Sequence, residues 1–95
     1  MRRDEALRML REHRAELEAL GVRSLALFGS VARDEAGPES DVDLLVDLDA
    51  PTFSGYMDAK FYLEDLLCRK VDLVTEDGLR PRVRPYVERD LIRVA

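Results

Sequence analysis

Two aspartates at the start of a hydrophobic segment are the residues of this sequence best placed to do chemistry. Asp41 and Asp43 are separated by one residue in the stretch "SDVDLLV". If this stretch is a β-strand, both carboxylates point to the same face, because successive strand side chains alternate between faces. Two ionised carboxylates side by side repel each other, and a shared cation relieves that repulsion. Short side chains that offer only oxygen ligands favour Mg²⁺ or Mn²⁺.

Two further features could complete such a site. Asp72 lies in a later hydrophobic segment, "KVDLVT", in the same phase, and would join the two aspartates if the segments are neighbouring strands. Gly29 and Ser30 end the hydrophobic run "LALF". Glycine lets the backbone approach an anion closely, and a helix beginning at Ser30 would offer free N–H groups to a phosphate. Together these are the parts needed for phosphoryl or nucleotidyl transfer.

The spacing of apolar residues predicts the elements that must position these side chains. Residues 4–20 predict an amphipathic helix that Asp4 would cap and Gly21 would end. Its apolar side consists of Ala6, Leu7, Leu10, Leu17 and Leu20, with His13 packed among them. Residues 41–48 predict a strand with the aspartates on one face and an apolar opposite face. That apolar face consists of Val42, Leu44, Val46 and Leu48.

The remaining segments complete a small sheet with helices. They are predicted as a strand over 22–29, a short helix over 30–37, a helix over 54–68, a strand over 70–75, a short helix within 79–90 and an edge strand over 91–95. The apolar positions of the helix over 54–68 are Met57, Phe61, Leu63, Leu66 and Leu67. This order predicts an α/β (α+β) fold in which helices pack against a sheet of about four strands.

Size and composition limit the possible classes of protein. A chain of 95 residues is long enough for one compact domain, so residues 1–95 are predicted to form a single domain. With 46% hydrophobic and 37% charged residues, the chain is expected to fold. Its net charge of -5 argues against a general nucleic-acid-binding surface, although a bound cation could still attract a nucleotide.

The expected location is the cytoplasm. Cys68 is the only cysteine, so an internal disulfide and a CxxC metal motif are both excluded. No apolar run approaches the roughly 18 residues needed to span a bilayer. Acidic residues in "MRRDEALRML" stand where a signal peptide would have its apolar region. We therefore expect no membrane association.

The stretch "GSVARDEAGPESDVDLLV" resembles the Gly-Ser…Asp-x-Asp signature of the DNA polymerase beta-like nucleotidyltransferase superfamily. Its form Gly-Ser-x-Ala-Arg…Ser-Asp-x-Asp-Leu is that of the small minimal nucleotidyltransferases (MNT). The resemblance covers essentially the whole chain, because the leading helix, the third aspartate in "VDLV" and the terminal helix and strand also match. A bare Gly-Ser or a bare Asp-x-Asp would be weak, but their agreement in type and spacing is specific. The implied fold is a single-domain nucleotidyltransferase fold with a mixed sheet.

The resemblance implies a catalytic role for the three aspartates. Asp41 and Asp43 would bind two Mg²⁺ ions. Asp72 would bind one of the two ions and help to deprotonate the attacking hydroxyl. The implied reaction transfers a nucleoside monophosphate, AMP from ATP being the best match, to a hydroxyl with release of pyrophosphate.

The resemblance also implies contacts to the nucleotide. Gly29 and Ser30 would hold the triphosphate, and Arg33 and Ser40 would add contacts to the nucleotide or its phosphates. One residue departs from the pattern, since Asp34 stands where many members carry glycine. An acid at that position would disfavour a triphosphate unless its side chain points to solvent.

Small MNT proteins are typically paired with a helical HEPN-domain protein in a toxin–antitoxin module. The resemblance therefore implies an antitoxin that binds its HEPN partner and, in some cases, adenylylates a tyrosine on it. Larger nucleotidyltransferases bind the base or the acceptor with an added domain, which is not expected in a chain of this size. A second copy of the chain could supply those contacts in place of the HEPN partner. Three other functions stay open at this point: a small-molecule nucleotidyltransferase of the antibiotic-modifying kind, the catalytic half of a two-subunit transferase, and a non-catalytic binding module.

Simpler interpretations of the same residues also exist. Asp41 and Asp43 could be a turn cap and a solvent-facing strand residue, and Asp72 an exposed acid of an edge strand. The C-terminal arginines could form a solvated helix face or a docking surface for an acidic partner or nucleic acid. These are Arg80, Arg82, Arg84, Arg89 and Arg93.

Overall fold

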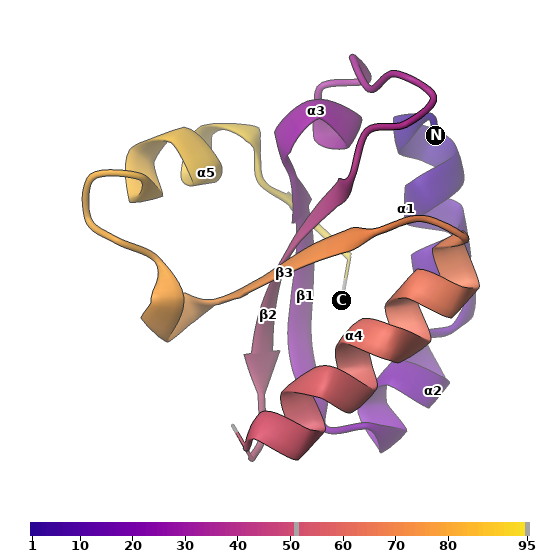
Figure 1. The fold of residues 1–95 in the computed structure, drawn as a ribbon, viewed down its shortest axis with the longest axis vertical. Coiled ribbons are helices and arrows are strands. Elements are labelled where there is room, and N and C mark those ends of the chain that lie inside the picture. The colour runs from indigo at the N-terminus through magenta and orange to yellow at the C-terminus, as the bar shows by residue number, and fades with distance from the viewer. Residues whose placement is uncertain (51, 95) are drawn as a thin grey trace.

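One mixed sheet organises the computed structural model, which describes residues 1–50 and 52–94. Its strands are β1 (Val22–Phe28), β2 (Val42–Leu48), β3 (Val71–Thr75) and β4 (Ile92–Arg93). They lie in the order β3-β2-β1-β4. β1 runs antiparallel to β2 and β4, whereas β2 and β3 are parallel, as the connecting helix between them requires (Figure 1). The predicted four-stranded mixed α+β fold is confirmed.

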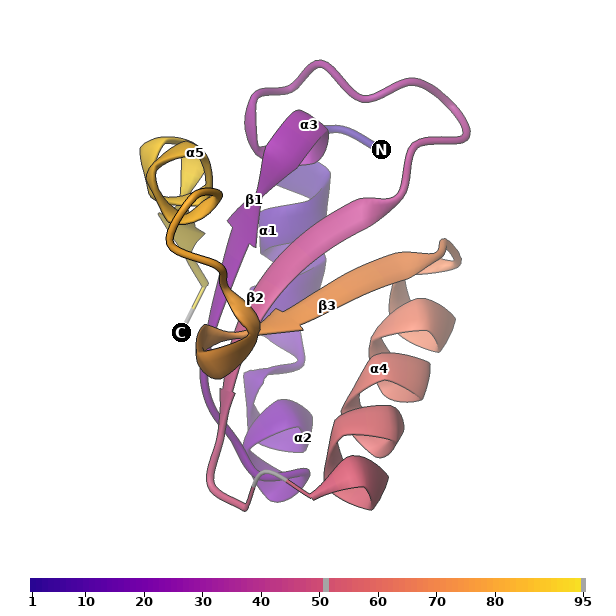
Figure 2. The ribbon, with the colours of Figure 1, turned by 60° about the vertical axis from the view of Figure 1, so that its left-hand side comes forward.

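Helices cover the two faces of the sheet unequally. The larger layer consists of α1 (Arg3–Glu12), α2 (Arg14–Ala19) and α4 (Phe53–Leu67). On the opposite face lies α5 (Arg84–Asp90), as Figure 2 shows. The connections use two short elements, α3 (Gly29–Ala32) after β1 and a 3₁₀ turn (Glu76–Gly78) after β3. In residues 1–50 and 52–94, no helix is long and apolar enough to cross a membrane.

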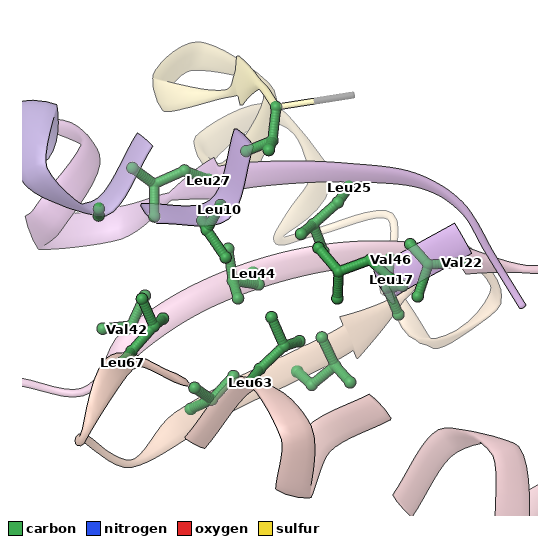
Figure 3. Close-up of a cluster of buried hydrophobic side chains, with 14 of the residues drawn as sticks. Leu10, Leu17, Val22, Leu25, Leu27, Val42, Leu44, Val46, Leu63 and Leu67 are labelled. Carbon is green, nitrogen blue, oxygen red and sulfur yellow. The ribbon is translucent and has the colours of Figure 1, made fainter. Parts of the chain in front are cut away.

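The main core lies between the sheet and the larger helical layer. Leu27 and Leu44 of the sheet and Leu10 and Leu63 of the helices are fully buried there (Figure 3). The predicted apolar face of β2 is part of this core, because Val42, Leu44, Val46 and Leu48 are all buried. A smaller cluster occupies the other face under α5 and consists of Ala26, Leu45, Leu79 and Val87. The continuous apolar run of β1 is therefore explained by burial on both faces.

The leading helix differs from its prediction in being broken at His13. The His13 N–H bonds to the Leu10 carbonyl at 3.3 Å, and the imidazole Nδ1 lies 2.9 Å from the Met9 carbonyl oxygen. The side chain thus takes the Met9 carbonyl that the His13 backbone N–H would have used in a continuous helix, and the segment is divided into α1 and α2. Gly21 ends α2 with φ +89°, as predicted.

Two other predicted elements and one predicted side-chain position need correction. The short helix expected over 30–37 ends at Ala32, and the edge strand expected over 91–95 is only two residues long. Ala95 lies outside the described residues. Phe61 was expected on the apolar side of α4 but is 55% exposed, and Ala59 is buried in its place. In α5, Pro85 stands in the first turn, as one of the two predicted alternatives required.

Asp34, and not the predicted Asp4, caps the leading helix. Its Oδ1 atom accepts a hydrogen bond from the Arg3 backbone N–H at 3.0 Å, and Oδ2 lies 3.3 Å from the Arg2 guanidinium. The N–H bond from Arg3 is the main reason that the pKa of Asp34 is lowered. Asp34 also has φ +59°, a left-handed conformation that Asp tolerates better than most residues. The cap therefore joins the turn after α3 to the start of α1.

This double role predicts the order of stability of three Asp34 variants. Asp34→Asn keeps a side-chain acceptor and the left-handed backbone, so it should cost least. Asp34→Gly keeps the backbone but loses the cap, and Asp34→Ala loses the cap and also strains the backbone. We expect Asp34→Ala to lower the free energy of unfolding by about 1–3 kcal/mol, measured by urea denaturation. Equal stability of the Ala variant and wild type would contradict the cap.

Candidate active site

Three side chains form one row across β1, β2 and β3 near one end of the sheet. In the antiparallel register Phe28 of β1 pairs with Asp43 of β2, and in the parallel register Asp43 pairs with Asp72 of β3. Because paired residues point to the same face, the three side chains lie side by side. This face is the one opposite α1, α2 and α4. Strand pairing thus brings Asp72 to Asp43 although 29 positions separate them in the sequence.

Asp41 lies immediately before β2 and adds a third carboxylate to this region. Its side chain is exposed, and its charge acts on Asp43. All three predicted aspartates are therefore brought to one end of the sheet. In residues 1–50 and 52–94, no three His, Cys, Asp or Glu side chains are arranged to hold a metal ion by themselves. A site of this kind suits an ion that takes one or two carboxylates and completes its shell with water and phosphate, as Mg²⁺ does.

Asp43 is the electrostatic centre of the site. Its pKa is raised to about 6, mainly by partial burial and then by the negative charges of Asp72 and Asp41. The positive charge of Arg33 acts against this shift but does not cancel it. Asp43 therefore resists ionisation because it is partly buried and because two other carboxylates lie near it. The donor set and its charge therefore fit a divalent cation.

Gly29 is required by the position of Asp43. It has φ +74°, and a Cβ atom added to it would overlap the Asp43 Oδ2 atom and lie 2.9 Å from Cγ. Only glycine allows the backbone to pass this carboxylate so closely. Ser30 follows in the first turn of α3 and is partly exposed. The predicted Gly-Ser turn and the aspartate row are thus in direct contact.

Arg33 and Ser40 have protein partners in this structure. The Arg33 guanidinium lies 2.6 Å from a carboxylate oxygen of Asp90 in α5 and 3.3 Å from one of Glu35. These two hydrogen bonds raise the pKa of Arg33. The Ser40 hydroxyl accepts the Gly37 N–H at 2.9 Å and holds the turn before Asp41. Their predicted contacts to a nucleotide stay predictions.

Two residues of this region were not expected from the sequence. Phe28 occupies the first position of the row, and its place directly before Gly29 was the signal that could have identified it. Asp90 is only 12% exposed and binds the Arg33 side chain. No local pattern indicates that role, because the two residues are 57 positions apart.

The crowding at Asp43 predicts an unusual pH dependence of stability without metal. An acid with a raised pKa in the folded state stabilises the fold below its unfolded pKa, and this contribution is lost as the pH rises through about 6. Asp43→Asn should therefore unfold at a higher temperature than wild type at pH 8 in EDTA. We expect a difference on the order of 1 kcal/mol, since solvent screens a partly buried carboxylate. The difference should shrink towards pH 4, as measured by thermal unfolding.

Asp47→Asn is the matched control. Asp47 is on the same strand, but its carboxylate lies 3.7 Å from the Arg23 guanidinium, so its removal should not stabilise the fold. An Asp43→Asn variant that is less stable than wild type at pH 8 in EDTA would contradict the repulsion.

The sequence of this chain is similar to those of named proteins over almost its whole length. A Methanocaldococcus jannaschii protein named as a candidate protein adenylyltransferase is 43% identical over 95 residues, which cover 95% of this chain and 95% of the relative. The protein adenylyltransferase MntA of Thermococcus cleftensis is 39% identical over 93 residues, which cover 96% of this chain and 94% of the relative.

Solved structures agree with these relatives. The structure of a candidate minimal nucleotidyltransferase matches with a TM-score of 0.80 at 41% identity and covers 97% of this chain and 95% of that chain. A complex of a tri-AMPylated Shewanella oneidensis HEPN toxin with MNT antitoxin matches with a TM-score of 0.67 at 17% identity, covering 94% and 71%, and shows the shared fold alone. The nucleotidyltransferase domain family matches residues 7–94. The chain therefore belongs to the nucleotidyltransferase domain family, as a member of the minimal type that its motif predicted.

Proposed function

We propose that the protein transfers AMP from ATP to a hydroxyl group of another protein in a Mg²⁺-dependent reaction. The observation that carries this proposal is the row formed by Asp43 and Asp72, in contact with Gly29. Membership of the nucleotidyltransferase domain family supports the reaction class. The choice of adenylyl transfer to a protein is supported by relatives named as protein adenylyltransferases at 39–43% identity.

Asp41, Asp43 and Asp72 are the residues that would hold Mg²⁺. When bound, Mg²⁺ neutralises charge on the phosphates and on the reacting oxygens. The chain itself contributes a fixed negative face whose carboxylates are kept close by the parallel pairing of β2 and β3. Mn²⁺ would suit the same oxygen ligands.

Backbone groups and one base complete the proposed reaction. Gly29 and Ser30 would position the triphosphate, with Arg33 and Ser40 as further contacts. The acceptor oxygen attacks the α-phosphorus and its proton passes to Asp72. The bond from the α-phosphorus to the bridging oxygen breaks, and pyrophosphate leaves with that electron pair. Asp72 is suited to this proton transfer because its side chain is exposed on the open face.

The proposed acceptor is a HEPN-domain partner, which would make this chain the antitoxin of the pair. The support is the shared fold with MNT antitoxin in complex with an AMPylated HEPN toxin. A second copy of the chain is the alternative acceptor or partner. The site face leaves room for either, because Asp41 and Asp72 are exposed there.

The reaction predicts transfer of label from α-labelled ATP to the partner protein. Wild type with Mg²⁺ should label the partner, and EDTA should abolish labelling. Asp43→Asn should lower the rate at least a thousandfold, because it removes one charge of the proposed metal site and keeps the shape of the side chain. Asp47→Asn should keep its activity. An Asp43→Asn variant as active as wild type would overturn the metal site.

Binding of the partner separates the enzymatic function from a non-catalytic one. We expect Asp43→Asn to bind the HEPN partner as tightly as wild type in a pull-down and in titration calorimetry, because it leaves the fold intact. If wild type binds the partner tightly but transfers no label in the presence of Mg²⁺ and ATP, the protein is a binding module and the enzymatic proposal fails.

A further inference from the structure

A small hollow of about 250 Å³ lies directly beside Asp72 on the open face of the sheet. The sheet forms one wall of this hollow, and the segment that leads into α5 forms the other. Its lining includes Phe28, Asp72, Val74, Leu79, Arg80 and Val83. Two of these residues, Phe28 and Asp72, belong to the row that contains Asp43. The hollow therefore continues the candidate active site down the sheet.

The walls of the hollow suit a flat ring. They are mainly apolar. The volume of the hollow is slightly below the roughly 300–1,000 Å³ of pockets that enclose drug-sized ligands, so it has room for a single ring system. The Phe28 ring and the Arg80 guanidinium offer two groups on which a nucleobase can stack. Val83 is 44% exposed and lies at the mouth.

Within residues 1–50 and 52–94, Arg80 and Arg82 form no ion pair, and of the two only Arg80 lines the hollow. Arg84 forms ion pairs with Glu76 and Glu88, and Arg89 pairs with Asp90. In residues 1–50 and 52–94, no carboxylate lies within ion-pair distance of Arg80. A cation that lines a hollow without such a partner can contact a ligand there.

We propose that this hollow is the subsite for the nucleobase of the nucleoside triphosphate, and that Val83 and Arg80 set the nucleotide preference. The proposal rests on the proposed function and deepens it. Phe28 is bonded directly to Gly29, so a ring against Phe28 and phosphates against Gly29 can belong to one molecule. A nucleoside triphosphate has both parts, with the reacting phosphorus between them opposite Asp43.

A larger hollow of about 520 Å³ lies between α4 and β3 and does not fit this role. It is lined by Phe53 and Tyr56 and by the far end of β3, and none of the three site aspartates lines it. Phe53 is 81% exposed there. Substitution of Phe53 is therefore a control, because it changes an exposed apolar side chain beside a hollow that is not the proposed subsite.

The test compares the binding of a nucleotide with the binding of phosphates alone. The probes are α,β-methylene ATP, which cannot transfer AMP, and inorganic tripolyphosphate, each titrated calorimetrically with Mg²⁺. Val83→Phe should fill the hollow and weaken α,β-methylene ATP at least about fivefold, the lower end of what lost base stacking removes. It should leave tripolyphosphate binding unchanged. Phe53→Ser should change neither affinity.

Each outcome decides between the assignments. Unchanged α,β-methylene ATP binding in Val83→Phe would overturn the base subsite and leave the hollow for the acceptor. An equal loss for both probes would also overturn it, because the substitution would then act on the phosphates. If wild type binds neither probe, the proposed function is wrong, and the base subsite that rests on it is wrong as well. If Val83→Phe does not fold, Val83→Leu should give a smaller loss confined to α,β-methylene ATP.

Discussion

Strand register is the constraint on which the candidate site depends. Asp43 is held between Phe28 and Asp72 by backbone pairing on both sides of β2. A slip of one residue in β2 would turn Asp43 into the core under α4 and expose Leu44. The burial of Val42, Leu44 and Val46 on one face therefore fixes the carboxylates on the other. The hydrophobic core stabilises the fold and, by the same contacts, keeps the carboxylates close despite their repulsion.

The unequal covering of the sheet is the second condition for a site. The layer of α1, α2 and α4 supplies most of the buried apolar surface, so the opposite face need not be closed. There α5 packs through Val87 on a small cluster that includes Ala26 and Leu45, and the Arg33–Asp90 pair joins it to the turn after α3. This ion pair is partly shielded on the Asp90 side. It positions α5 beside the row, where Phe28 packs against the cluster under α5 and Asp72 stays exposed.

Local patterns predicted the elements and the faces of the strands, whereas contacts between distant residues could not be predicted. Alternation in residues 41–48 was sufficient to place Asp41 and Asp43 together and to predict the buried face. Whether Asp72 lies beside Asp43 depends on the order of the strands, which the sequence does not give. The parallel pairing of β2 and β3 places the two residues side by side. The break at His13 depends on a side chain that competes for a backbone carbonyl, and Phe61 shows that apolar type alone does not decide which side of α4 is buried.

Asp34 shows how a residue can depart from a motif without disturbing the site. The position has φ +59°, which explains why glycine is common there in the resembling proteins. Aspartate tolerates this backbone, and its carboxylate turns to the start of α1, where the Arg3 N–H and the Arg2 guanidinium hold it. Its charge is thus balanced by a helix N-terminus and a cation. The acid stabilises the turn next to the proposed phosphate site, and its side chain is directed to α1 instead of the phosphates.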